Sequence, residues 1–199
     1  VAIIGGNRIP FVRSNTSYSQ ASNMDMLSAT LEGLVERFNL SGQRLGEVAA
    51  GAVMKHSRDF NLAREDTLNS GLSLQTPAYD VQQACGTGLE AAILVGNKIA
   101  LGQIESGIAA GTDTASDAPV AVNEKYRHML LNLNRAKTLG QRLTALASIR
   151  PSFMAPLLPA NAEPRTGLSM GQHCELMVKQ WDISREEQDQ LTFNSHQNL

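Results

Sequence analysis

The spacing of apolar residues in the first half of the chain predicts alternating strands and helices. Val1–Gly5 is a short apolar run of the β type, and a strand is expected there. From Asn23 to Phe38 apolar residues recur every three or four positions, which predicts an amphipathic helix of about four turns. Val48–Met54 then has the pattern of a buried strand, and Phe60–Leu72 returns to helical spacing.

The following segments continue the same order. Pro77 ends the second helix, and Ala78–Val81 has the residue types of a strand. Gly86–Leu101 is apolar nearly all round, as expected of a helix buried between layers. Ser106–Gly111 is typical of a further buried strand. This alternation predicts a mostly parallel sheet with helices on both faces, and therefore an α/β fold.

The character of the sequence changes after residue 118. Asn123–Ala136 and Leu139–Ile149 are helical but basic. The segment 150–166 contains four prolines, Pro151, Pro156, Pro159 and Pro164. Because proline lacks an amide donor and restricts the preceding residue, these positions exclude a regular helix or a central strand. We therefore expect an inserted loop domain over residues 119–168.

Helical spacing returns from Gly167 to Gln180, and Ser184 followed by Glu187 predicts a capping box at the start of a last helix. We expect residues 1–118 to form an N-terminal α/β domain and residues 169–199 to be return helices of that domain. Val1 is not a methionine, and the last helix has neither a glycine cap nor a proline stop. On this basis the chain is expected to be part of a longer protein.

The amino-acid composition argues against several classes of function. Of the 199 residues, 42% are hydrophobic and 18% are charged, as in ordinary globular proteins. A net charge of -2 gives no broad positive field, which argues against nucleic acid as a partner. No apolar run reaches the length of a transmembrane segment, and the histidines lack a metal-ligand spacing, so no membrane span and no metal are expected. Two cysteines do not make a disulfide framework, which favours a reducing compartment.

Cys85 is the principal candidate for chemistry. It lies between a predicted strand and the predicted helix that begins near Gly86, where unpaired amides and the helix dipole favour an anion such as a thiolate. Gly86 and Gly88 leave room for a substrate carbonyl to approach the backbone, and the Cys85 amide could donate to a developing oxyanion. Residue spacing alone also leaves open that Cys85 is a buried small hydrophobic residue at a helix start.

Five segments stand out in chain order: Arg8–Phe11, Asn61–Arg64, Cys85–Gly88, Ala110–Ser116 and Ser169–Glu175. Together they resemble the motifs of the thiolase family over essentially the whole chain, with Cys85–Gly88 in the place of the nucleophile motif. Asn134–Leu143 and Arg165–Leu168 look most like the fatty-acid-oxidation thiolases of the trifunctional-enzyme β-subunit type. The resemblance implies the N-terminal half of the thiolase fold, a layered α/β/α/β/α architecture with an inserted loop domain.

The resemblance implies a two-step acyl transfer of fatty acid β-oxidation. Cys85 would attack the 3-keto group of a 3-ketoacyl-CoA, acetyl-CoA would leave, and a second coenzyme A would collect the shortened acyl chain. Coenzyme A would be a substrate, with no permanently bound cofactor. Ser169 and Met170 would contact the substrate, and Met170 would line the pocket near the acyl group. The resemblance further implies a homodimer, admits a hydratase/dehydrogenase α-subunit as a partner, and places the protein in the bacterial cytoplasm or the mitochondrial matrix.

This sequence also departs from the family pattern. Gln82 and Thr87 stand where many members have Asn and Ser, and His173 and Cys174 replace Thr and Ala in the helix motif, which leaves the pocket shape open. The family's later histidine and second-cysteine motifs are not found. The groups that move protons are therefore expected beyond Leu199, and these 199 residues alone should turn over negligibly.

For several other residues the sequence predicts an environment but no catalytic role. Cys174 is expected to pack in the core, and His173 either to reach the acyl pocket or to be exposed or capping. Five basic residues of the inserted region suit the phosphates of coenzyme A, although a solvated helix face explains them equally well: Arg127, Arg135, Lys137, Arg142 and Arg150. Burial in their own domain is expected for Met129, Leu130, Leu131 and Leu133, with a partner subunit or a membrane surface as alternatives.

Two other functions stay open. A biosynthetic acetoacetyl-CoA thiolase would use the same chemistry in the direction of condensation. A non-catalytic thiolase-like module that binds acyl-CoA or a partner subunit would account for the missing histidine and second cysteine.

Overall fold

The computed structural model describes residues 1–158 and 160–198. The chain divides into two compact units, Val1–Val120 and Ala121–Leu199. The assignment of residues 169–199 to the N-terminal domain stays a prediction.

The first unit is built on a parallel three-stranded sheet. Its strands are β1 (Glu47–Ala50), β2 (Ala78–Asp80) and β3 (Gly107–Ala109). β1 lies in the centre, and the strand order is β2-β1-β3. In the register of the sheet Val48 pairs with Ala78 on one side and with Ile108 on the other. All three strands therefore end at the same edge of the sheet.

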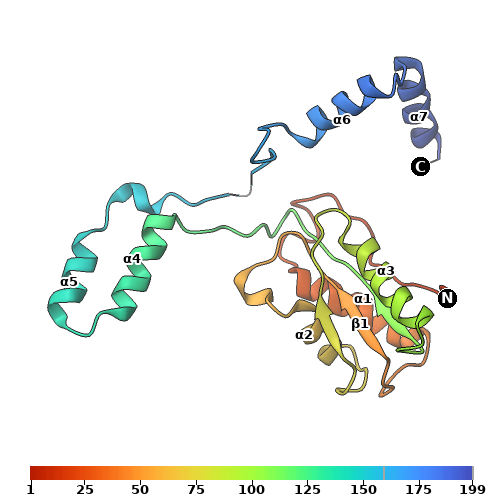
Figure 1. Ribbon diagram of the computed structural model, residues 1–199, viewed down its shortest axis with the longest axis horizontal. Helices are drawn as coiled ribbons and strands as arrows, with labels where there is room; N and C mark the ends of the chain where they lie inside the picture. Colours follow the sequence, from red (N-terminus) through yellow and green to blue (C-terminus); the bar gives the residue numbers. More distant parts are fainter. Residues whose placement is uncertain (159, 199) are drawn as a thin grey trace. The chain divides into compact units, whose positions relative to one another are not determined.

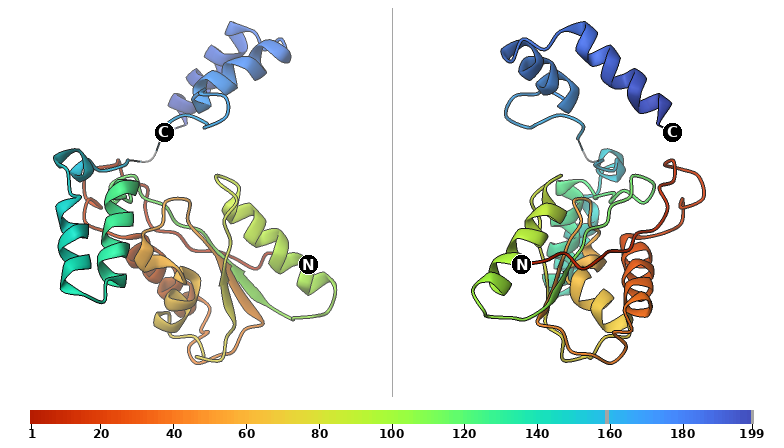
Figure 2. Two further views of the ribbon diagram at one scale, coloured as in Figure 1. Left: turned by 60° about the vertical axis from the view of Figure 1, so that its left-hand side comes forward. Right: turned by 90° about the vertical axis from the view of Figure 1, so that its right-hand side faces the viewer.

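Helices cover both faces of this sheet. The helices are α1 (Asn23–Arg37), α2 (Leu62–Asn69) and α3 (Thr87–Ala100), and a short 3-10 turn, η1 (Ser57–Asp59), precedes α2. α1 and α2 pack together on one face, and α3 lies on the other (Figures 1 and 2). This arrangement confirms the α/β class predicted from the alternation of strands and helices.

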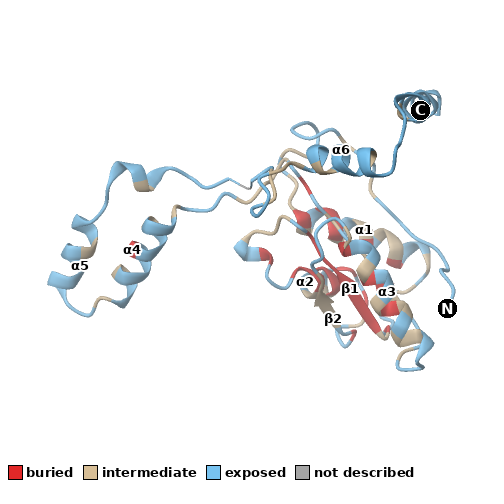
Figure 3. Ribbon diagram, turned by 45° about the horizontal axis from the view of Figure 1, so that its top comes forward, coloured by how far each residue is buried: buried red, intermediate tan, exposed pale blue. Residues whose placement is uncertain are grey.

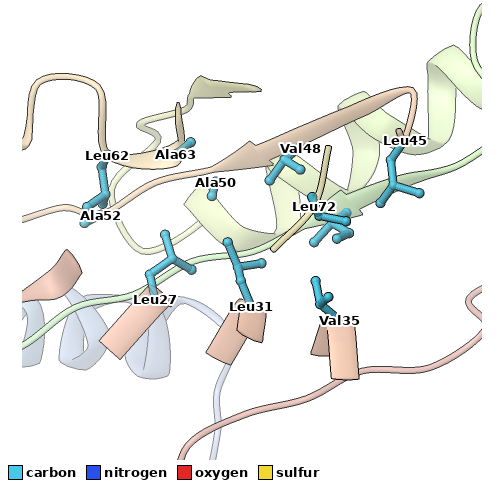
Figure 4. Close-up of a cluster of buried hydrophobic side chains, with 11 residues drawn as sticks. Leu27, Leu31, Val35, Leu45, Val48, Ala50, Ala52, Leu62, Ala63 and Leu72 are labelled. Atoms are coloured by element: carbon cyan, nitrogen blue, oxygen red, sulfur yellow. The ribbon is translucent and has the colours of Figure 1, made fainter. Parts of the chain in front are cut away.

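The alternation of side chains along β1 divides the core into two parts. Val48 and Ala50 point toward α1 and α2, where they join a cluster that includes Leu27, Leu31 and Leu62 (Figure 4). Ala49 belongs to a smaller cluster with two residues of α3, Ala91 and Val95. All four residues of β1 are buried: three are apolar, and the fourth, Glu47, forms an ion pair with Lys98.

Two predictions about these elements were wrong. Val1–Gly5 forms no strand, and Ile3 is 94% exposed, because no neighbouring strand among the described residues satisfies its backbone groups. Helix α3 is buried along one face only: Thr87, Ala91 and Val95 are buried, whereas Leu89 is exposed. The apolar residues that occur all round this helix therefore did not mean that it is covered on both sides.

The second unit consists of helices with little buried surface. Its elements are α4 (Glu124–Arg135), α5 (Leu139–Ala147), the 3-10 turn η2 (Pro151–Met154), α6 (Met170–Gln180) and α7 (Arg185–Gln197). α4 contacts both α5 and η2. The predicted capping box of α7 is present, since Ser184 and Glu187 bond each other's backbone amides. The only tryptophan of the chain, Trp181, directly follows α6 and is largely exposed.

Buried residues concentrate in the first unit (Figure 3). In the second unit Met129 is the only fully buried hydrophobic residue among those described, which confirms its predicted burial. Leu130 and Leu131 are exposed, so their predicted burial was wrong. Both lie on α4, which packs against α5 and η2. Among the described residues, no helix is both long and apolar enough to cross a membrane.

Candidate active site

Cys85 lies at the edge of the sheet where the three parallel strands end. It follows β2 by five residues and precedes the first residue of α3, Thr87, by two. Its side chain is a free thiol exposed to solvent. The predicted position immediately before a helix is confirmed, and the alternative of a buried hydrophobic residue is excluded by the exposure.

The backbone makes a tight turn around Cys85. The residue before it, Ala84, has φ 44°, in the left-handed region that residues with a side chain seldom adopt. Behind it the Gly86 N–H donates to the Gln83 carbonyl at 2.9 Å, and the Thr87 N–H donates to the Ala84 carbonyl at 3.2 Å. The turn places Cys85 at its outer side, next to the start of α3.

The Thr87 hydroxyl bonds to both sides of this turn. It accepts a hydrogen bond from the Gln83 N–H at 2.9 Å and donates one to the Ala84 carbonyl at 2.7 Å. Thr87 is 5% exposed, so its side chain is largely shielded from water, whereas Gln83 and Ala84 are exposed. Thr87 therefore belongs to the framework that supports Cys85.

Residues next to Cys85 in the chain carry unpaired backbone donors. Among the described residues we find no acceptor for the N–H groups of Cys85, Gly88 and Leu89. Unpaired amides of this kind are a general feature of a helix start, where they combine with the positive end of the helix dipole. Donors so placed stabilise a thiolate and the oxyanion of a tetrahedral intermediate.

The loops that follow β1 and β3 pack against this helix start. A Cβ atom at Gly51 would overlap the Val81 carbonyl oxygen and approach Thr87 Cγ2 to 2.9 Å. A Cβ atom at Gly111 would lie 3.6 Å from both the Gly51 oxygen and Gly88 Cα. Three backbones therefore meet at close range, which requires glycine at Gly51.

Two aspartates hold these loops at the strand ends. The Asp113 carboxylate, after β3, accepts the Val53 and Met54 N–H groups at 2.8 and 3.0 Å. Asp80, the last residue of β2, accepts the Ala63 N–H at 2.8 Å and forms an ion pair with Lys55 at 2.6 Å. Sequence reasoning assigned no role to either aspartate, although a carboxylate at or shortly after the end of a predicted strand was a usable signal.

Comparisons with known proteins agree with this geometry. A model of the thiolase N-terminal domain family matches residues 1–199. The chain belongs to the thiolase family. A protein of Vibrio cholerae serotype O1 named 3-ketoacyl-CoA thiolase is 39% identical over 196 residues, and one of the same name from Shewanella denitrificans is 38% identical. Each match covers 98% of this chain and 45% of the relative, so the chain spans less than half of their length.

Solved structures show the same fold. The crystal structure of the Bacillus anthracis acetyl-CoA acetyltransferase superposes with a TM-score of 0.69 at 20% sequence identity. The match covers 96% of this chain and 43% of that one. The family resemblance and the thiolase fold predicted from the motifs are thereby confirmed.

The remaining candidate residues of this thiolase chain lie in the second unit. Ser169 caps α6, where its hydroxyl accepts the Gln172 N–H at 3.3 Å, and Met170 is 62% exposed. Their predicted contact with substrate stays a prediction. His173 bonds the Thr166 hydroxyl at 3.1 Å. Cys174 is exposed, so its predicted place in the core was wrong: among the described residues, α6 buries none of its side chains.

The basic residues of the second unit are in different environments. Arg127 is paired with Glu124 at 2.7 Å on the helix surface. Arg150, together with Lys125 and His128, lines a cleft of about 590 Å³ between α4 and η2. Lys125 was missed by the sequence argument. Within the part of the chain that the structure describes, no cluster of three His, Cys, Asp or Glu residues could hold a metal ion.

Proposed function

We propose that the protein to which this thiolase chain belongs transfers acyl groups through Cys85, cleaving a 3-ketoacyl-CoA with coenzyme A. The observation that carries the proposal is the exposed Cys85 thiol at the start of α3, beside unpaired backbone amides. It is supported by relatives that are named 3-ketoacyl-CoA thiolase and match 98% of the chain.

In the first step the Cys85 thiolate attacks the 3-keto carbon, and the carbonyl oxygen becomes an oxyanion that the amides of Cys85 and Gly88 can receive. The bond between carbons 2 and 3 then breaks. Carbon 2 leaves with the electron pair and takes up a proton to give acetyl-CoA. In the second step a coenzyme A thiolate attacks the acyl-Cys85 thioester, which releases the shortened acyl-CoA and restores the thiolate.

We assign the reaction to the degradative direction, fatty acid β-oxidation, and treat an acetoacetyl-CoA thiolase as the second candidate. The names of the relatives favour the first, whereas the solved acetyl-CoA acetyltransferase shares only the fold. Comparing kcat/KM for acetoacetyl-CoA and for a long-chain 3-ketoacyl-CoA separates the two candidates. A strong preference for acetoacetyl-CoA would sink the assignment.

The finer parts of the proposal rest on the family resemblance. Ser169 and Met170 would contact the acyl-CoA, and coenzyme A would be the only thiol cosubstrate. The protein would act as a homodimer, with a hydratase/dehydrogenase α-subunit as a further partner. Two free cysteines and bacterial relatives support the cytoplasm of a bacterium, with the mitochondrial matrix as the alternative compartment.

The nucleophile is tested by trapping the acyl-enzyme. The protein is mixed with acetyl-CoA, quenched in acid and digested, and mass spectrometry locates the acetyl group. Cys85→Ser should abolish labelling at this segment, and the matched variant Cys174→Ser, at the other exposed thiol, should retain it. Acetylation of Cys174 with Cys85 unmodified would refute the assignment.

A further inference from the structure

The turn before Cys85 is held in a conformation that its own residues do not favour. Ala84 is one of four non-glycine residues with positive φ among those described. The other three, Asn15, Asn39 and Asp182, are of the types that tolerate the left-handed region. An alanine there costs about 1 kcal/mol relative to its ordinary backbone conformations, so the surroundings must hold it.

Besides the backbone bonds of the turn, one side chain holds Ala84. Thr87 Oγ1 bonds the amide before Ala84, that of Gln83, and also the carbonyl of Ala84 itself. One hydroxyl thus spans the left-handed residue. The Thr87 methyl is held in turn by the backbone of Gly51, at a distance that leaves no room for a side chain there. The hydroxyl therefore has a fixed position and a fixed pair of partners.

We propose that Thr87 is the positioning residue of the nucleophile: its hydroxyl locks Ala84 in the left-handed conformation and thereby directs the Cys85 thiol to the unpaired amides of α3. Thr87 does not touch the reacting atoms. This inference rests on the proposed role of Cys85, but it concerns the reactivity of the thiol, which can be measured without any acyl transfer.

Two substitutions separate the hydroxyl from the methyl group. Thr87→Val keeps the branched shape and removes both hydrogen bonds, whereas Thr87→Ser keeps the hydroxyl and removes the methyl group. The readout is the rate of alkylation of Cys85 by iodoacetamide at pH 7, measured by peptide mass spectrometry. The alkylation rate of Cys174, in the other unit, is the internal control for differences in reagent concentration and pH. We expect Thr87→Val to lower the alkylation rate of Cys85 about tenfold. The rate in Thr87→Ser should stay within about twofold of the rate in the unsubstituted chain.

A double variant tests the mechanism and guards against simple misfolding. Glycine adopts the left-handed region without penalty. Adding Ala84→Gly to Thr87→Val should therefore restore the rate of Cys85 alkylation, by at least about half of the loss on a logarithmic scale. Equal alkylation of Cys85 in Thr87→Val and in the unsubstituted chain would overturn the proposal. So would an equally slow Thr87→Ser variant, or no recovery with Ala84→Gly.

The same variants distinguish this inference from the proposed function. If the acyl-enzyme never forms on Cys85 but alkylation follows the expected order, the function fails and the role of Thr87 stands. If the acyl-enzyme forms on Cys85 at the same rate in Thr87→Val, the function stands and the role of Thr87 fails.

Discussion

Asp66 of α2 lies fully buried against α1, an unusual place for a carboxyl group. Ser28 donates a hydrogen bond to its Oδ1 atom at 2.6 Å, and its Oδ2 atom has no partner among the described residues. Burial raises the pKa of Asp66 to about 7, against the lowering effect of the Ser28 bond, and the carboxylates of Asp59, Asp80 and Asp25 raise it further. The group therefore carries its proton at mildly acidic pH.

This pKa predicts that the first unit loses stability as pH rises. Because the folded state binds the proton more tightly than the unfolded chain, the contribution is full below about pH 4 and is lost as pH rises to 7. We expect the free energy of unfolding to fall on the order of 2 kcal/mol between pH 5 and pH 8. Asp66→Asn should flatten this dependence in denaturant titrations followed by circular dichroism.

The neighbouring exposed carboxylate, Glu65, provides the matched control. Glu65→Gln should leave the pH dependence unchanged. An equal loss of stability between pH 5 and pH 8 in Asp66→Asn would show that another group is responsible.

At the scale of elements, the close contact of three backbones determines how α3 meets the sheet. Gly51 follows β1, Gly111 follows β3, and Gly88 lies in the first turn of α3. Only the first of these has no room for a side chain, because the Val81 carbonyl and the Thr87 methyl occupy the space. The start of α3, and with it Cys85, is fixed by this contact.

We therefore expect opposite results from two glycine substitutions. Gly51→Ala should lower the free energy of unfolding by about 2–4 kcal/mol, since a backbone carbonyl would have to move. Gly88→Ala meets nothing within 4 Å and should be neutral or stabilise α3 by up to about 1 kcal/mol. Denaturant titration of the two variants measures both values, and a tolerated Gly51→Ala would contradict the packing described here.

The elements themselves were largely readable from the sequence, but the turn at Cys85 was not. Periodicity located α1 and the order of strands and helices, because apolar spacing follows burial. The left-handed φ of Ala84 could not be predicted from the residue type, because glycine or asparagine usually occupies such a position. The role of Thr87 was hidden for a similar reason: its bonds run to backbone atoms of residues within the same turn.

At the scale of the whole molecule, the buried hydrophobic residues are divided unequally between the two units. Nearly all fully buried hydrophobic residues lie between Met26 and Ile108, and Met129 is the exception among those described. Since burial of apolar surface is the main source of stability, the two units of the chain should differ in resistance to local opening. Sequence hydropathy missed this difference, because the leucines of α4 and α5 have the same spacing as those of a buried helix.

Hydrogen exchange should make the difference visible. We expect amides of β1 and α3 to exchange at least about tenfold more slowly than those of α4 to α7, measured on peptides at neutral pH. Residues within the first turn of each helix are left out of the comparison. Equal protection in the two units would show that the second unit is stabilised by more than its own side chains.

The position of Trp181 has a practical consequence for spectroscopy. The chain has one tryptophan, which follows α6 in the second unit, whereas the unit that contains Cys85 has none. Within these 199 residues, intrinsic emission excited at the red edge of the absorption band therefore reports only the surroundings of α6. A thermal melt recorded in this way could show a complete transition while the sheet is still intact, and a reporter placed on α3 would be needed to follow the nucleophile.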